Sequence, residues 1–411
     1  MTSEGKISGR RWAYPAIGLL MNIILGTIYS WSVFRKPLEN ALGWNSLDSS
    51  LPFTVFLLMF AILMPISGKL MERLGPRNTA ILGGVLVGLG WALGGLLTSS
   101  QLSLPMMVLT YGVIGGSGVG MVYGVPIAVS SRWIPERKGL AVGLTVMGFG
   151  LSPLITAPLA KSMIDATGVL NTFTYLGLTF LAALVLLSIP LRFPEGPGSS
   201  AQAKTGEGIS LAPREIVKTA TFYGIWLAYV LGTMGGFIAI SLAAKYGEEV
   251  VALDSATAAL ATSLFAVFNG IGRPTFGSIC DRIGVKKGAV ISFLLILIAS
   301  LTATQSTTLV PYLASFAILW FTFGGWLAIA PTATSSFFGL KHQSVNYGIV
   351  FTAYGAGALI GPSLAGYIYQ STGTYYSAFL VTAAISVFGM IIAALTFRKP
   401  KPASSAGAPS P

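Results

Sequence analysis

Two short stretches of the sequence repeat each other. Gly68 to Arg77 reads G-K-L-M-E-R-L-G-P-R, and Gly277 to Lys286 reads G-S-I-C-D-R-I-G-V-K. Each places an acid, an arginine, a glycine and a base in a short polar segment between two long apolar runs. An acid in such a turn can pair with basic groups and cap helix ends. The duplication predicts a chain built from two related halves.

The amino-acid composition indicates that most of this chain lies in a membrane. Of its 411 residues, 53% are hydrophobic and only 9% are charged, whereas about 25% of the residues of a soluble domain are charged. A helix needs roughly 20 apolar residues to cross a bilayer. We therefore predict an all-α membrane protein with twelve transmembrane helices in two six-helix bundles. The expected spans are 12–34, 50–71, 78–98, 104–129, 138–161, 171–191, 220–244, 256–280, 287–305, 309–332, 345–369 and 374–397.

Composition shifts along the chain predict its division. Residues 1–191 form an N-terminal bundle, 192–219 a hydrophilic cytoplasmic linker, 220–397 a C-terminal bundle, and 398–411 a disordered cytoplasmic tail. Most of the 25 Lys and Arg residues fall in segments on the same side as both termini. The positive-inside rule then places both termini in the cytoplasm, in a multi-pass protein of the inner (plasma) membrane.

Several classes of function are excluded by what the sequence lacks. The net charge of +12 is scattered over short loops, so nucleic acid is not an expected partner. One cysteine, Cys280, allows no internal disulfide, and one histidine, His342, leaves few metal or catalytic arrangements. No span carries a set of catalytic residues. We expect no enzyme activity, no cofactor and no metal, and a monomer in the lipid bilayer.

Arg273 is the only charge in the interior of any expected span, away from the span ends. Burying arginine there costs roughly 3 kcal/mol on insertion scales, and such residues usually face the bundle interior or a wet cavity. One interpretation is that Arg273 reaches the interface or pairs with backbone carbonyls. The other is that its guanidinium binds a carboxylate in a water-filled cavity. Asn269 lies one turn earlier and can bond to the guanidinium or to a ligand, or contact another helix.

Aromatic residues in several spans are candidates for the walls of this pocket. Their tyrosine hydroxyls can hydrogen-bond a carboxylate, and their phenylalanine rings would limit ligand size. Ordinary packing is the alternative explanation for each. Leu144 is a further candidate, as an apolar wall. The aromatic candidates are Tyr29, Tyr123, Phe149, Phe323, Phe351 and Tyr354.

The repeated loops also supply candidates for a gate. Glu72 with Arg73, and Asp281 with Arg282, can hold one face closed through ion pairs, although solvated loop charges are the alternative. His342 is expected at the surface, with pH sensing as the second interpretation.

A separate pattern predicts helix packing. Gly112, Gly116, Gly120 and Gly124 recur every four residues in one span. A nucleotide-binding loop is excluded because no strand precedes them and no phosphate-binding lysine follows. Small residues at this spacing let two helices approach closely.

The repeated loop G-x-x-x-[DE]-R-x-G-x-[RK] in a six-plus-six chain resembles the major facilitator superfamily. Four further motifs resemble its monocarboxylate transporter and oxalate/formate antiporter branches, and most of all bacterial proton-coupled L-lactate transporters. The resemblance implies the major facilitator fold, with a substrate site at the midplane between the halves. The motifs are G-T-I-Y-S-W (26–31), R-W-I-P-E-R-K-G-L-A (132–141), N-G-I-G-R-P (269–274) and N-Y-G (346–348).

The sequence departs from those branches at two positions. Asn269 stands where the resembling monocarboxylate transporters have a proton-carrying aspartate, so a proton would travel on the substrate or on another residue. Tyr354 stands where the resembling antiporters have a lysine, which leaves one cation to match one carboxylate. We expect a secondary active transporter of small monocarboxylates such as L-lactate and pyruvate, by proton symport. The alternatives are a carboxylate anion exchanger of the formate/oxalate type and a carboxylate receptor that does not transport.

Overall fold

A computed structural model describes residues 10–45, 48–98, 103–194 and 210–400. Residues 195–209, which make up most of the expected linker, and 401–411, which make up most of the expected tail, lie outside the described residues. The described part of the chain contains helices and no strands. The boundaries predicted for the two bundles, the linker and the tail stay predictions.

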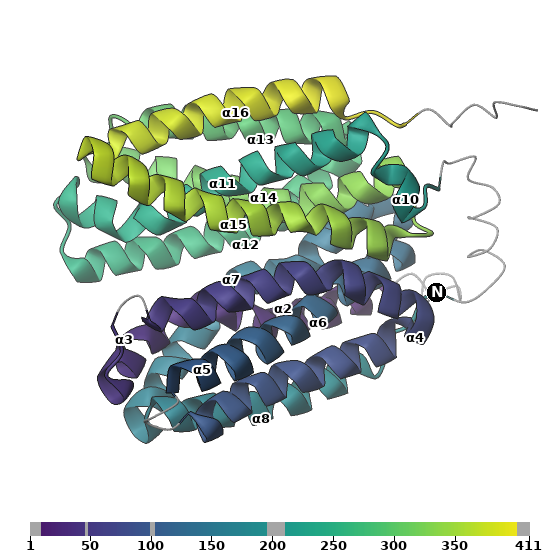
Figure 1. The fold of residues 1–411 in the computed structure, drawn as a ribbon. Coiled ribbons are helices and arrows are strands. Elements are labelled where there is room, and N and C mark those ends of the chain that lie inside the picture. The colour runs from purple at the N-terminus through teal and green to yellow at the C-terminus, as the bar shows by residue number, and fades with distance from the viewer. Residues whose placement is uncertain (1–9, 46–47, 99–102, 195–209, 401–411) are drawn as a thin grey trace, which may run out of the picture.

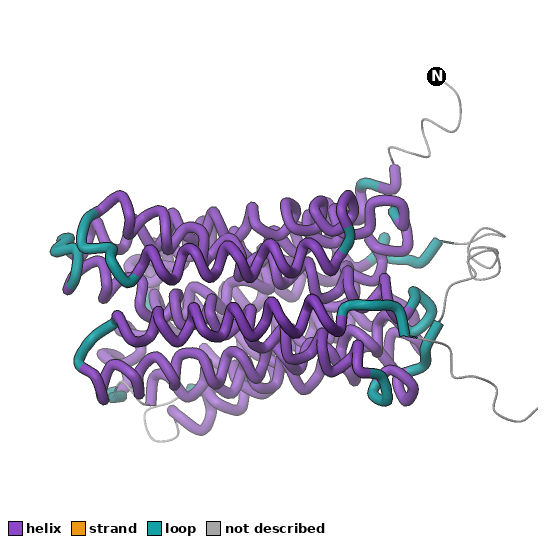
Figure 2. The backbone as a smooth tube through the Cα atoms, turned by 90° about the horizontal axis from the view of Figure 1, so that it is seen from above, coloured by secondary structure: helices purple, strands orange, loops and turns teal. Residues whose placement is uncertain are grey.

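The helices form two groups that follow each other in sequence and lie side by side in Figure 1. Their long axes run in the same general direction in both views (Figures 1 and 2). We call the side on which α2 begins and α16 ends the terminal face, and the opposite side the far face. The first group comprises α2 (Ala13–Leu25), η1 (Gly26–Ser30), α3 (Trp31–Leu42), η2 (Asp48–Ser50), α4 (Leu51–Leu97), α5 (Ser103–Met107), η3 (Val108–Gly115), α6 (Gly116–Trp133), η4 (Pro135–Arg137), α7 (Lys138–Thr167) and α8 (Val169–Ser188). The second comprises α10 (Pro213–Ile216), α11 (Ala220–Glu249), α12 (Ser255–Ile283), α13 (Val285–Ala303), α14 (Leu309–Phe338), α15 (Gln343–Thr372) and α16 (Tyr376–Thr396).

Eleven helical segments of the described chain are long and apolar enough to cross a membrane. The number is eleven because α4 contains two of the expected spans, joined at Gly75, whose backbone is not helical. Val55 and Gly90 lie on opposite sides of this break, and both approach the segment around Gly112 to Gly115. The two arms of α4 therefore run back along each other and supply two crossings. The predicted all-helical fold of twelve crossings is confirmed.

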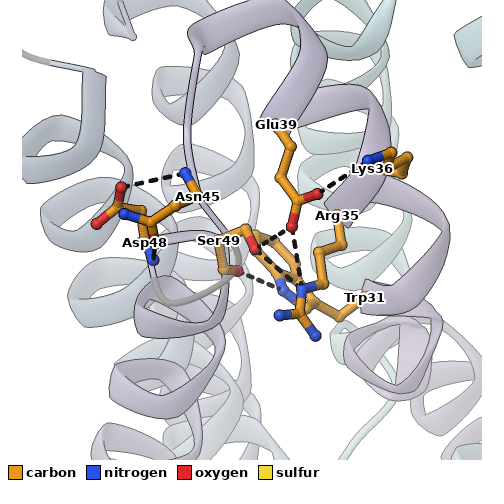
Figure 3. Close-up of polar contacts among 7 residues, drawn as sticks. All are labelled: Trp31, Arg35, Lys36, Glu39, Asn45, Asp48 and Ser49. Carbon is orange, nitrogen blue, oxygen red and sulfur yellow. Dashed lines mark hydrogen bonds and ion pairs between the residues drawn. The ribbon is translucent and has the colours of Figure 1, made fainter.

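Polar contacts at the far face join α3, in the first membrane crossing, to the turn before α4, which forms the second (Figure 3). Glu39 accepts a hydrogen bond of 2.7 Å from the Ser49 hydroxyl and forms an ion pair with Arg35 at 3.4 Å. The indole of Trp31 donates to the Ser49 carbonyl at 3.0 Å. These bonds join the end of α3 to the turn that leads into α4, so the two helices enter the bundle together.

The glycine stripe packs against α4, as its spacing predicts. A Cβ at Gly116 would lie 2.6 Å from the carbonyl oxygen of Phe56, and one at Gly120 would lie 2.7 Å from that of Phe60. Such distances are shorter than side chains tolerate, so only glycine lets these helices come this close. The stripe begins in the π-helical turn η3 and continues into α6.

The two groups of helices also meet through glycines. Gly139 of α7 and Gly277 of α12 face each other, and a Cβ on either would lie within 2.3 Å of the carbonyl oxygen of the other. On the opposite side of the interface, a Cβ at Gly68 of α4 would lie 2.5 Å from the Ser344 carbonyl of α15. Two close helix pairs, α7 with α12 and α4 with α15, therefore join the halves.

Helix α12 has defined ends. Asp254 caps its start, accepting hydrogen bonds from the backbone N–H groups of Ala256 and Thr257 at 3.1 and 3.0 Å. The hydroxyl of Thr257 donates to the same carboxylate at 2.6 Å, and this bond contributes most to lowering the pKa of Asp254. Gly284, with φ of +87°, ends the helix. These two ends set the position along α12 at which its buried residues meet α7.

The break in α4 gives a test of the fold. Gly75 has φ of +78° and ψ of 169°, a backbone region that is essentially restricted to glycine and costs other residues on the order of 1–3 kcal/mol. We expect Gly75→Ala to lower the thermal unfolding temperature of the purified protein in detergent. Gly366→Ala is the matched control, because Gly366 lies inside α15 with open space around it. Equal shifts for the two variants would contradict the role of Gly75.

Candidate functional site

Arg273 lies in α12 with its side chain fully buried, at 0% exposure. Its Nη1 donates a hydrogen bond of 2.6 Å to the carbonyl oxygen of Val146 in α7. The side chain therefore points into the interface between the halves. As the alternative to binding a carboxylate, we had considered that Arg273 reaches the membrane interface or pairs with backbone carbonyls. The first is wrong, because the side chain is buried between the halves. The second is observed, with Val146.

Asn269 holds the other side of the guanidinium. Its Oδ1 accepts from Nε and Nη2 of Arg273 at 3.4 and 3.3 Å, and the amide side chain is itself buried. Gly150 of α7 makes room for this pair, because a Cβ there would lie 3.0 Å from Nε and 3.1 Å from the Asn269 oxygen. Residues four apart on α12 and a glycine on α7 thus fix the orientation of the guanidinium.

The charge of Arg273 has no anionic partner among the described residues. None of the ion pairs in this part of the chain includes it, and its acceptors are an amide oxygen and a backbone carbonyl. Burying a cation without a counter-charge costs several kcal/mol. A guanidinium has five N–H groups, so donors remain after these bonds. The arrangement suits a small anion that brings the missing negative charge.

All six predicted aromatic residues lie in one connected cluster beside Arg273. The hydroxyls of Tyr29, from the first half, and Tyr354, from the second, form a hydrogen bond across the interface. The Phe149 ring centre is 5.8 Å from the guanidinium carbon of Arg273. The centroid distances between rings are 5.1 Å for Tyr29–Phe149, 5.3 Å for Tyr123–Phe149, 5.4 Å for Tyr123–Phe351, 4.9 Å for Phe351–Tyr354 and 6.5 Å for Phe323–Tyr354.

Two phenylalanine rings extend the cluster, and the sequence analysis missed both. Phe60 of α4 stands between the halves, 5.2 Å from Tyr123 and 4.9 Å from Phe351. Phe237 of α11 packs 5.3 Å from Tyr354. Phe60 sits on the α4 face that meets the glycine stripe, which was a usable signal. Nothing in the sequence distinguishes Phe237.

The remaining predictions for the pocket have different outcomes. Leu144 of α7 is partly exposed and lies outside the aromatic cluster, so its assignment stays a prediction. A water-filled cavity around Arg273 is wrong for this conformation, because Arg273, Asn269 and Tyr354 are each at most 1% exposed. The site is closed over by aromatic rings. Access to it requires the two halves to move.

Asp281, one of the two acids of the expected gate, contacts backbone N–H groups and not the predicted arginine. The two oxygens of Asp281 in α12 accept hydrogen bonds from the backbone N–H groups of Gly139 and Leu140, both at 2.8 Å. These N–H groups belong to the first turn of α7. A carboxylate at a helix start is favoured by the free N–H groups and by the helix dipole. Asp281 therefore connects the second half to the first at the terminal face.

Glu72, the other acid of the expected gate, also contacts the other half of the protein. Glu72 of α4 lies 3.2 Å from Nδ1 of His342, which directly precedes α15. His342 lies at the surface, as expected, with a side chain that is 27% exposed, and it also contacts the other half through Glu72. Arg73 and Arg282 are exposed and form no ion pair with the described residues. The predicted partners are thus corrected: each acid reaches across to the start of a helix in the other half.

Other contacts close the terminal face between these two acids. Arg132 of α6 donates to the carbonyl oxygens of Leu340 and Lys341 at 3.2 and 3.4 Å. The hydroxyl of Ser131 donates to Oε1 of Gln343 at 2.8 Å. The sequence analysis gave neither Arg132 nor Ser131 a role in the gate, because their partners lie some two hundred residues away in the sequence.

A fold of paired helical bundles around a buried central site defines a class of membrane transporters. The family model of the Major Facilitator Superfamily matches residues 15–260 and 225–411. The chain belongs to this superfamily. It is a transporter with a small-molecule cargo and an integral membrane protein, and it is not an enzyme.

Relatives and solved structures agree with this assignment. The chain is 30% identical over 388 residues to the oxalate:formate antiporter of Oxalobacter formigenes, covering 94% of this chain and 91% of that protein. It is 27% identical over 377 residues to monocarboxylate transporter 13 of Rattus norvegicus, covering 89% and 84%. The crystal structure of the superfamily transporter FucP in the outward conformation superposes with a TM-score of 0.72 at 15% identity, covering 92% of this chain and 97% of that one. The predicted family and fold are confirmed.

The contact of Asp281 with α7 gives a prediction about closure. We expect Asp281→Asn to favour opening of the terminal face about tenfold, because an anion at a helix start contributes up to about 2 kcal/mol. Ser344→Cys in a Cys280→Ser background reports this opening, since Ser344 is buried between α15 and α4. Maleimide labelling of that cysteine should speed up with Asp281→Asn. Arg282→Gln is the control, because it alters an exposed neighbour of Asp281, and it should leave the labelling rate unchanged. Equal labelling rates in the two variants would refute the role of the contact between Asp281 and α7 in closing this face.

Proposed function

We propose that the protein is a secondary active transporter of small monocarboxylates, such as L-lactate and pyruvate, that works by alternating access around Arg273. One observation carries this proposal: a fully buried guanidinium lies between the halves and has no carboxylate partner among the described residues. An organic anion of one charge would neutralise it. A neutral pair should also lower the electrostatic cost of moving the halves around the cargo.

Charge matching favours one carboxylate over two. Tyr354, at the position where we expected a second cation in a dicarboxylate carrier, is occupied by its hydrogen bond to Tyr29. A second carboxylate would therefore meet phenol hydroxyls and aromatic rings and would lack a counter-charge. The printed names of the relatives, an oxalate:formate antiporter and monocarboxylate transporters, support a carboxylate as the cargo.

Each group in the site receives a role in this proposal. Arg273 binds the carboxylate, and Asn269 orients the guanidinium. Tyr29 and Tyr123 donate hydrogen bonds to oxygen atoms of the cargo. The phenylalanines of the cluster limit its size, and Leu144 is an outlying wall. Asp281 and Glu72 act as the gate.

We further propose that the terminal face is cytoplasmic and that the protein works as a monomer in the inner (plasma) membrane. The support is the distribution of charge. Lys69, Arg77 and Lys286 lie in the repeated segments at this face and Lys287 directly follows the second one, and basic residues are enriched in cytoplasmic loops.

Removing the guanidinium tests the central claim. We expect Arg273→Gln to lower uptake of labelled L-lactate by proteoliposomes at least about a hundredfold, since a charged hydrogen-bonded pair is worth roughly 3 kcal/mol. Arg282→Gln is the control, because Arg282 is an exposed arginine on the same helix. Normal uptake by a folded Arg273→Gln protein would overturn the proposal.

The proposed coupling is symport of one proton with one monoanion. Asn269 cannot carry a proton, and every Asp and Glu of the described residues lies near a helix end or in a turn. The proton would then travel on the carboxyl group of the cargo. Such transport is electroneutral, so a pH gradient should drive uptake and a membrane potential alone should not.

Anion exchange is a second candidate, and the same observation favours it. A site with a fixed cation and no titratable acid among the described residues can stay loaded by swapping one anion for another. Proteoliposomes under three conditions separate the candidates: a pH gradient, a membrane potential, or unlabelled formate inside. We expect uptake with the pH gradient. Uptake that appears only with internal formate would replace symport by exchange, and uptake driven by potential alone would contradict both.

A further inference from the structure

Three tyrosine hydroxyls in and beside the aromatic cluster make no hydrogen bond of good geometry with the described residues. They belong to Tyr123 of α6, Tyr229 of α11 and Tyr347 of α15. Their side chains are at most 2% exposed. A buried polar group without a partner costs about 1–3 kcal/mol, so buried hydroxyls are normally bonded. Three exceptions at one place need an explanation.

The three residues form a single group. Their rings surround Phe351, at centroid distances of 5.4 Å for Tyr123, 6.4 Å for Tyr229 and 5.8 Å for Tyr347. The hydroxyl of Tyr347 is close enough to those of Tyr123 and Tyr229 for weak hydrogen bonds, and the Tyr123 hydroxyl also reaches Arg273. They come from both halves, because α6 is in the first and α11 and α15 are in the second. We call these three residues the hydroxyl ladder.

The hydroxyl ladder leads from Arg273 toward the terminal face. Gln343, Tyr347, Phe351 and Tyr354 follow one another at helical spacing along α15, which begins at the terminal face. Tyr354 is in the aromatic cluster, whereas Gln343 is in the closed contact with Ser131. The Nε2 of Gln343 is a further buried donor without a partner. A line of polar groups with unfilled hydrogen-bonding capacity therefore runs through the half of the interface that is shut.

Ordinary packing does not explain this line. Phenylalanine would fill nearly the same space as tyrosine without burying a hydroxyl, and the chain uses it at neighbouring positions such as Phe60 and Phe351. The phenol groups and the glutamine amide can all donate hydrogen bonds. A ligand that supplies acceptors, such as a carboxylate, matches them. In the closed conformation there is no path for it to enter from this side.

We propose that Tyr229 and Tyr347 of the hydroxyl ladder form a second carboxylate subsite, which receives the cargo from the central site of Arg273 and Tyr123 when the terminal face opens. This inference rests on the proposed function, because it assumes a carboxylate cargo and alternating access. The phenol O–H groups donate to the carboxylate oxygens and replace part of the solvation that the anion loses. The subsite is neutral, so it holds the anion less tightly than Arg273 and lets it leave. It serves the terminal face alone.

Transport measured separately from the two faces tests this subsite. Tyr229→Phe and Tyr347→Phe remove one hydroxyl each and keep the ring. Uptake of labelled L-lactate is measured in proteoliposomes with the terminal face inward, and in a second set with it outward. We expect the half-saturating concentration at the terminal face to rise about tenfold, which is the loss of one hydrogen bond to a charged group. The value at the far face should stay within about twofold, the size of a weak neutral contact.

Tyr111→Phe is the matched control. Tyr111 is fully buried and its hydroxyl also lacks a partner, but its ring packs with Trp31 and Trp91 inside the first half. It should change neither half-saturating concentration. All three variants should unfold at the same temperature as the parent protein or higher, because each loses an unsatisfied buried group.

The outcomes distinguish the two proposals. If the parent protein transports L-lactate but the ladder variants match Tyr111→Phe at both faces, the subsite is wrong and the proposed function stands. Equal losses at both faces would also overturn the subsite, because they would place the hydroxyls at the shared central site. If the parent protein transports neither L-lactate, pyruvate, acetate nor formate, the proposed function and the subsite fail together.

Discussion

The site depends on one constraint: a guanidinium buried in an apolar interior must be surrounded by acceptors. In water this cation is solvated, but here it donates hydrogen bonds to oxygens of Val146 and Asn269, and the hydroxyls of Tyr29 and Tyr123 lie close to it. Gly150 keeps α7 close enough for both bonds. Because these acceptors are neutral, the positive charge is held in place without being cancelled. This is the condition in which an anion binds strongly.

The aromatic cluster and the closed terminal face follow from the same need. Rings from α4, α6, α7, α11 and α15 exclude water from the guanidinium, which strengthens its interaction with any anion. The contacts of Asp281 and Glu72 hold the halves together at one face. These contacts are polar and lie at the edge of the membrane, so they can break and reform without leaving a charge in hydrocarbon. The buried site is therefore closed at this face by contacts that can open without a large energetic cost.

Much of this arrangement can be predicted from local pattern. The spacing of Asn269 and Arg273 places both on one face of a helix, and the structure keeps them together. The four-residue glycine repeat predicts a close helix contact and makes one with α4. The six aromatic candidates meet in one cluster, although Phe60 and Phe237 were missed because their sequence neighbours are equally apolar. The partners of Asp281 and Glu72 were predicted wrongly because each acid contacts the start of a helix in the other half and not the arginine next to it in sequence.

The sequence by itself determined the class of structure: apolar runs of membrane length, a repeated turn, and one arginine that has to avoid lipid. These features follow from the cost of placing polar groups in hydrocarbon, which acts on each segment separately. Only the tertiary structure decided what lies opposite Arg273, that the closed conformation has no cavity around it, and that each acid reaches the start of a helix in the other half. Those contacts join residues more than a hundred positions apart, so they depend on how the two bundles pack and not on any local pattern.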